Sequence, residues 1–293
     1  MADCFKGLTF SFDEKSSNMY GLYMGWRSLD SEWETGIDRE VVTSESNMVN
    51  HIPNQYGVKY TDNLILEFDI FHQDGSPFTY RESRAINNWF TQETYKKFKV
   101  NDYNTDNIYY KAICTSIRDI ADGDFYGKHI VLQCDSPFGY TGETTKVVDA
   151  SDSGEKSWSI INSSDDGAYS PLIYIECSGE YTDNVEMTNL SSAKTMTLNM
   201  SDIPIRDSDN KKILDIDSRR MTIRDYAGNL IPLYKVGWVI VPDENSAIPS
   251  DEKYWLKFEP GMNKIELKGN AKFKFTMSFP RKVGQLNEQH LPM

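Results

Sequence analysis

The side chains that most often perform chemistry in proteins are few in this chain and lie far apart. The histidines form no His-Glu-x-x-His pair, and the cysteines form no Cys-x-x-Cys pair, so neither type has the spacing of a zinc site. We expect the cysteines to be reduced and the histidines to be structural. These residues are His51, His72, His129 and His290, with Cys4, Cys114, Cys134 and Cys177.

Two acidic stretches have the residue types of a site without its spacing. Residues 207–210 begin like a calcium-binding loop, but no glycine stands at loop position six, and Ser218 replaces the glutamate of position twelve. Asp215 and Asp217 are two apart in a strand-like run and should share a face. A glycosidase needs two carboxyls at a set separation, and the sequence identifies no such pair, which disfavours a polysaccharide hydrolase.

The chain also has no nucleophile elbow and no phosphate-binding Gly-x-x-x-x-Gly-Lys-Ser/Thr loop. We therefore expect no enzymatic activity, no catalytic residue, no metal site and no cofactor.

Aromatic side chains in the second half are the remaining candidates for ligand contact. Exposed aromatic rings on a β-sheet can stack on sugars, whereas buried rings dominate hydrophobic cores and protein interfaces. Four residues are therefore candidate glycan contacts, with packing in the core or at an interface as the alternative: Trp158, Trp238, Tyr254 and Trp255.

Composition excludes several classes of partner. The chain has 293 residues, a net charge of −13 and a pI near 4.8. An acidic surface repels nucleic acid and anionic membranes, so we expect neither sequence-specific nucleic-acid binding nor membrane insertion. The chain contains no run of about 18 apolar residues, and residues 1–6 lack the pattern of a secretory signal. With the cysteines expected to be reduced, we expect synthesis in a cytoplasm.

Period-two alternation of apolar and polar residues predicts an all-β chain. Strands are predicted at residues 8–12, 20–26, 64–70, 97–100, 108–114 and 129–134 in the first half, and from 158–161 onward in the second. One helix is predicted at about 80–91, with Thr79 and Glu82 as a capping box. Residues 38–60 are polar and rich in Asn, which predicts a long loop.

The last forty residues have the clearest pattern. Residues 264–268 and 272–279 alternate, and Gly269-Asn270 between them predicts a hairpin turn. One face would bury six side chains, which are Ile265, Leu267, Phe273, Phe275, Met277 and Phe279. A turn signal near residue 139 divides the chain into two predicted domains, 1–138 and 139–293.

Several short phrases occur in an order that resembles one known family. They are Tyr20-Gly21-Leu22, Trp89-Phe90, Tyr109-Tyr110-Lys111-Ala112, Cys134-Asp135-Ser136-Pro137-Phe138, Pro171 to Gly179, Ile216-Asp217 through Gly228-Asn229, and Pro260-Gly261-Met262-Asn263. The set resembles the distal tail protein (Dit) family of long-tailed bacteriophages over nearly the whole chain. Two regions depart from the family pattern: residues 38–60 lack its expected phrase, and residues 243–255 are inserted.

The resemblance implies two β-sandwich domains, the second similar to galectin or a carbohydrate-binding module. It also implies a structural virion protein of the tail tip or baseplate, which joins the tail tube to the baseplate and receptor-binding apparatus and is synthesised and assembled in the cytoplasm of a bacterial host. By this resemblance, residues 1–138 form a hexameric ring around a channel for the genome, and residues 139–293 project outward. The implied partners are the tail tube protein, the tail-associated hub or fibre and receptor-binding proteins, with a host surface glycan as a candidate. The alternative is a soluble carbohydrate-binding adhesin module.

Overall fold

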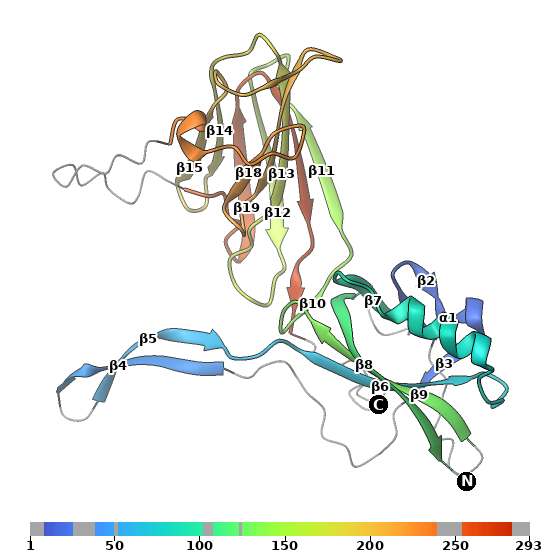
Figure 1. The fold of residues 1–293 in the computed structure, drawn as a ribbon. Helices are drawn as coiled ribbons and strands as arrows, with labels where there is room; N and C mark the ends of the chain where they lie inside the picture. Colours follow the sequence, from blue (N-terminus) through green and yellow to red (C-terminus); the bar gives the residue numbers. More distant parts are fainter. Residues whose placement is uncertain are drawn as a thin grey trace. The chain divides into compact units, whose positions relative to one another are not determined.

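The computed structural model describes residues 9–25, 39–49, 52–101, 108–122, 125–238 and 254–282, and β-strands are their main secondary structure (Figure 1). The chain forms two compact units. The first comprises residues 1–142 and 280–293, and the second comprises residues 143–279. The predicted all-β class is confirmed, with one α-helix among the described residues. No helix in these ranges is long and apolar enough to span a membrane.

The first unit is built on one antiparallel sheet with the order β2-β1-β7-β8-β9-β6-β3. A 3-10 turn, η1 (Ser17–Tyr20), precedes β3. β1 contacts β3 although the two strands lie toward opposite ends of the strand order, so the sheet curves back on itself. The strands are β1 (Thr9–Phe12), β2 (Lys15–Ser16), β3 (Leu22–Gly25), β6 (Ile65–His72), β7 (Lys96–Asn101), β8 (Tyr110–Asp122) and β9 (Phe125–Cys134). A further short pair joins β10 (Gly139–Tyr140) to β21 (Pro280–Arg281).

Helix α1 (Tyr80–Phe90) covers the core of this sheet, as the sequence predicted. The Thr79 hydroxyl accepts a hydrogen bond from the Glu82 amide, and the Glu82 carboxylate accepts one from the Thr79 amide at 2.8 Å. The helix buries Ile86, Trp89 and Phe90. The Trp89 indole donates to the Phe12 carbonyl at 2.8 Å, which ties the helix to β1.

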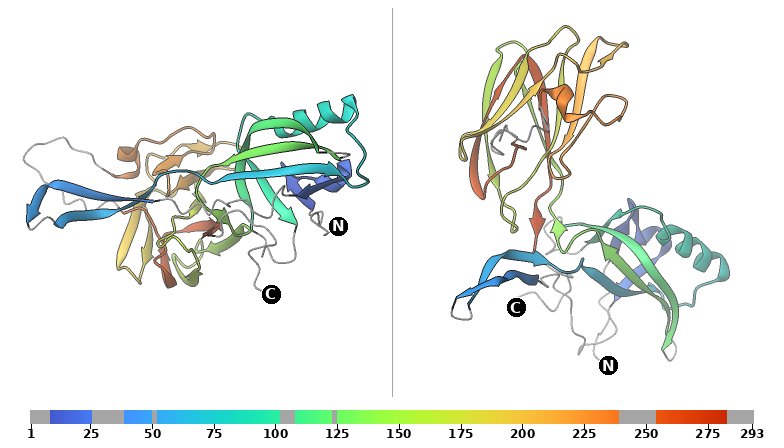
Figure 2. Two further views of the ribbon diagram at one scale, coloured as in Figure 1. Left: turned by 90° about the horizontal axis from the view of Figure 1, so that it is seen from below. Right: turned by 60° about the vertical axis from the view of Figure 1, so that its left-hand side comes forward.

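The predicted loop at residues 38–60 is wrong, because the structure has a β-hairpin there. Strands β4 (Arg39–Val49) and β5 (Ile52–Tyr60) pair in a two-stranded sheet outside the main sheet (Figures 1 and 2). Ladder hydrogen bonds need no buried face, so such a ribbon forms without the apolar alternation that marks a core strand. The ribbon leaves Val41, Val42 and Val58 exposed.

The second unit is a sandwich of two antiparallel sheets with its core between them. One sheet has the order β11-β20-β13-β17-β16 with β18 on β17, and the other has the order β12-β19-β14-β15. The first sheet contains β11 (Thr144–Asp149), β13 (Leu172–Ser178), β16 (Ile205–Arg206), β17 (Lys211–Asp217), β18 (Thr222–Arg224) and β20 (Ala271–Met277). The second contains β12 (Glu155–Asn162), β14 (Asn184–Asn189), β15 (Lys194–Asn199) and β19 (Gly261–Lys268), and a 3-10 turn, η2 (Leu233–Val236), contacts β15.

The predicted closing hairpin is also wrong, although its strands and its buried face are observed. β19 pairs with β12 and β14, whereas β20 pairs with β11 and β13 in the opposite sheet. The chain crosses between sheets at Gly269, where φ is 114° and a Cβ would lie 2.9 Å from a methyl carbon of Val185. Alternation fixes which side chains face the core, but it does not fix the partner strand. Of the six predicted side chains, five are buried and Phe279 is partly buried.

The buried face of β20 makes the core sensitive to charge. We predict that Phe275→Asp unfolds the second unit, because it puts an unpaired carboxylate at a position with no solvent exposure. Thr276→Asp, on the outward face of the same strand, should melt close to the native protein. Thermal unfolding followed by circular dichroism compares the two. An intact transition for Phe275→Asp would mean that β20 does not form the core.

The crossing at Gly269 gives a second prediction. Gly228 also has a positive φ, 83°, but nothing lies within 4 Å of a Cβ there. Both Gly→Ala substitutions should carry backbone strain of about 1 kcal/mol. Gly269→Ala should cost about 1–3 kcal/mol more in chemical denaturation, because its methyl group overpacks the sheet crossing. Equal losses for the two variants would refute the close approach at Gly269.

Candidate functional site

The structure packs the four candidate aromatic residues against the second unit's core. Trp238 and Trp255 are only 7% and 8% exposed, and their rings meet edge to face at 4.9 Å. The Trp238 indole donates to the Thr197 carbonyl, which protects the outer edge of β15. The Trp158 ring lies 5.2 Å from Phe275 and is partly buried.

Tyr254 is also partly buried, and its hydroxyl bonds to the backbone of Lys257. Its ring lies 5.5 Å from the Lys194 ammonium. These placements favour the packing alternative for all four residues, and a glycan contact by any of them stays a prediction.

The other sequence candidates are held in structural contacts. His129 hydrogen-bonds Asp69 at 2.7 Å, and burial raises the pKa of the Cys114 and Cys177 thiols to about 11, which keeps them protonated. The carboxylate of Asp209 is bound by Arg206. No group of three or more His, Cys, Asp or Glu side chains could hold a metal within the described part of the chain. His51, His290, Cys4 and residues 243–253 lie outside it.

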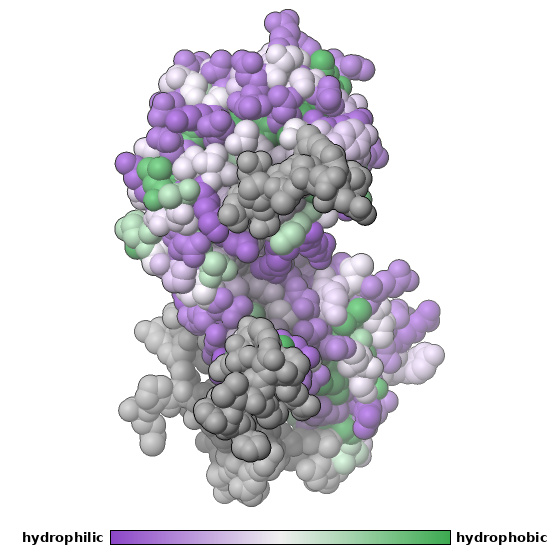
Figure 3. Space-filling model, turned by 90° about the vertical axis from the view of Figure 1, so that its left-hand side faces the viewer, coloured by the Kyte–Doolittle hydropathy of each residue, from purple (hydrophilic) through white to green (hydrophobic). Residues whose placement is uncertain are grey.

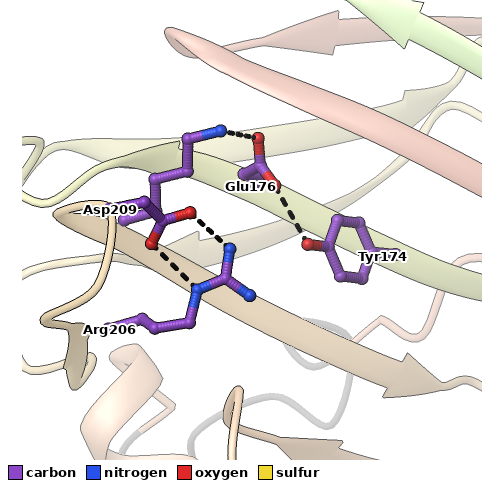
Figure 4. A network of polar contacts seen from close by, with 5 residues as sticks. Tyr174, Glu176, Arg206 and Asp209 are labelled. Carbon is purple, nitrogen blue, oxygen red and sulfur yellow. Dashed lines mark hydrogen bonds and ion pairs between the residues drawn. The ribbon is translucent and has the colours of Figure 1, made fainter.

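A network of polar contacts lies on the outward face of the sheet that contains β13 and β17. There the Lys211 ammonium bonds the Glu176 carboxylate, and the Tyr174 hydroxyl donates to the same carboxylate at 3.0 Å (Figure 4). The hydrogen bond from Lys211 lowers the pKa of Glu176, and desolvation raises that of Tyr174 to about 12. Tyr174 is therefore a neutral ring held in one position.

A groove of about 340 Å³ lies on the same outward face. Its central row crosses four strands in register, with Lys274 on β20, Tyr174 on β13, Asp215 on β17 and Arg224 on β18. Leu172 and Thr276 line it on the next row, and Asp217 and Arg220 close one end. Figure 3 shows the chain from the side on which Figure 1 places β14 and β15, and the residues coloured there are mainly hydrophilic, with small separate hydrophobic patches.

The groove's two carboxylates have different environments. Asp217 accepts hydrogen bonds from the amides of Arg219 and Arg220 at 3.0 Å, so it stabilises the turn between β17 and β18. Asp215 makes no hydrogen bond or ion pair with any described residue, and desolvation by its neighbours raises its pKa despite the nearby charge of Lys274. The sequence predicted that these two residues share a face. It gave no signal for Tyr174, Lys274 and Arg224, which strand pairing brings beside them.

Comparison with known proteins identifies the class of protein. Residues 5–136 match the family model described as "Phage tail protein N-terminal domain". The fold is similar to the crystal structure of the SPP1 Dit protein (gp 19.1), described as a paradigm of the hub adsorption apparatus in phages that infect Gram-positive bacteria. The TM-score is 0.58 at 15% identity, and the similarity covers 94% of this chain and 100% of that one. No curated protein sequence matches the chain.

The first unit is thus a phage tail protein domain, and the whole chain has the fold of a distal tail protein. The resemblance predicted from the ordered sequence phrases is confirmed. The two comparisons together support a structural protein of the virion tail.

The raised pKa of Asp215 predicts an unusual response to mutation. The folded-state pKa of this carboxyl lies above its ordinary value of 3.8, so its ionised form destabilises the folded protein. This destabilisation is present above the folded-state pKa and is lost as the pH falls through that pKa toward 3.8. Asp215→Asn should therefore raise the melting temperature at neutral pH and leave it unchanged in acid.

Asp152→Asn, at an exposed carboxyl in the turn after β11, is the matched control and should have no effect. Differential scanning calorimetry across the pH range makes the comparison. A lower melting temperature for Asp215→Asn at neutral pH would show that the carboxylate makes a stabilising contact.

Proposed function

We propose that this chain is a distal tail protein that joins the phage tail tube to the baseplate and its receptor-binding proteins. The observation that carries the proposal is the fold similarity to SPP1 Dit along both chains, with a tail-domain match over residues 5–136. In this proposal the first unit forms a hexameric ring with a central channel, and the second unit faces the host-recognition proteins. A soluble carbohydrate-binding adhesin is less favoured, because it would not need a tail domain.

The construction of the first unit supports a role in assembly. Its helix and folded sheet share one core that is rich in aromatic side chains, so they form a single packed domain. The β4–β5 hairpin stands outside that sheet and exposes valines on a pair of strands that have no further partner in the described ranges. Exposed apolar side chains on an open ribbon mark surfaces that other chains cover. We propose that neighbouring copies or the tail tube protein cover this hairpin.

Charge supports a conduit for DNA. A basic channel would bind the passing genome through phosphate contacts, whereas an acidic protein would not retain it. The net charge of −13 is in keeping with such a channel. We propose no catalytic role for the chain.

The ring can be tested by light scattering after size-exclusion chromatography. Six copies of the 33.7 kDa chain give about 200 kDa alone, and a complex of this ring with the tail tube protein should have a larger mass. Val41→Asp with Val58→Asp should shift the mass toward a folded monomer, because these directly paired valines would lie in the contact between copies.

Val147→Asp, at an exposed valine of the second unit, is the control and should keep the native mass. A native chain that stays monomeric both alone and with the tail tube protein would contradict the ring.

A further inference from the structure

The groove on the outward face of the second unit has the form of a small-ligand site. Its volume of about 340 Å³ lies within the range of ligand pockets in proteins, at the small end. The lining comes from strands β13, β17, β18 and β20, which are hydrogen-bonded to one another. Because the framework is a sheet, the groove is largely formed before any ligand arrives.

The floor of the groove combines an apolar surface with a fixed ring. Leu172 is 49% exposed although it lies within the sheet, and it is two residues from Tyr174 on the same face of β13. The Tyr174 hydroxyl is engaged by Glu176, which Lys211 holds in turn. The ring therefore keeps its position without a ligand, so binding would lose little side-chain entropy there.

The polar groups around this floor have unused hydrogen-bonding capacity. Asp215 and Lys274 make no hydrogen bond with any residue that the structure describes, and Arg224 donates to the Gly228 carbonyl at 2.7 Å but to no carboxylate. Asp215 is an acceptor, and Lys274 and Arg224 are donors. Lys274 and Asp215 flank Tyr174 in a single row, and Arg224 lies beyond Asp215 in the same row, so donors and an acceptor line the same groove.

This mixture selects among ligand classes. An anion would meet Asp215 and Asp217, and a cationic peptide would meet Lys274, Arg220 and Arg224, so a ligand of either charge meets like charge. A sugar hydroxyl both donates and accepts, which matches a row that offers both functions. The C–H face of a sugar ring can also cover the exposed surface of Leu172 and Tyr174.

We propose that this groove binds a neutral saccharide of one or two rings. The inference goes beyond the proposed tail function and does not need the ring to form. The proposed glycan site is therefore different from the one that the sequence indicated. None of the four candidate aromatic residues lines the groove, and all four pack in or against the core.

The test uses the full-length chain on an array of neutral mono- and disaccharides, with their sulfated and phosphorylated derivatives alongside. Titration calorimetry then measures the affinity for the best neutral sugar at millimolar concentration. The variants are Asp215→Asn, predicted to fold stably, and Lys274→Ala. The control is Glu266→Gln, which makes the same carboxyl-to-amide change on the outward face of the other sheet.

We expect a neutral sugar to bind, each groove variant to weaken binding at least tenfold, and Glu266→Gln to leave it unchanged. Failure of every neutral sugar to bind would overturn the proposal, and so would binding that both groove variants retain. Preference for the charged derivatives would show an anion site and overturn it as well. Light scattering on the same samples separates the outcomes, since a ring that binds no sugar contradicts only this inference.

Discussion

The second unit depends on one packing arrangement, in which two consecutive strands lie inside opposite sheets, each with a neighbour on both sides. β19 lies between β12 and β14, and β20 lies between β11 and β13. Their inward side chains, among them Leu267 and Phe273, meet in a core that excludes solvent. The connection between them must be short and must approach β14 closely, which only a residue without a Cβ permits at position 269. β20 also supplies Lys274 and Thr276 to the groove on the outward face, so the packing of this strand positions part of the groove's lining.

Local chemistry made part of this fold predictable from sequence. The helix was found because Thr79 and Glu82 form a capping box and the apolar residues that follow have helical spacing. Asn263, in the Pro260-Gly261-Met262-Asn263 phrase, is buried and bonds the backbone of Glu259, which holds the chain in place where β19 begins. Pairing partners could not be predicted in the same way. The hairpin of β4 and β5 and the sheet crossing at Gly269 depend on contacts that no local pattern specifies.

In the candidate site, too, local sequence patterns predicted some features, and strand pairing determined the others. Asp215 and Asp217 were visible as a pair on one strand face, but their roles differ because one stabilises a turn and the other lacks a partner among the described residues. Lys274 is far from Asp215 in sequence, and only the register of β13 with β17 and β20 places both beside Tyr174. The four aromatics were recognised by type, yet burial decides their role, and burial follows from the completed sandwich.

The proposed function requires a phage tail domain and a separate sandwich to act together in one tail protein. Cryo-electron microscopy of virions that contain this chain tests that claim most directly. The account predicts that the helix-covered seven-stranded sheet fits six equivalent densities around the channel at the distal end of the tail tube. Virions in which this fold is missing from the tail end, or occurs there without sixfold symmetry, would contradict it.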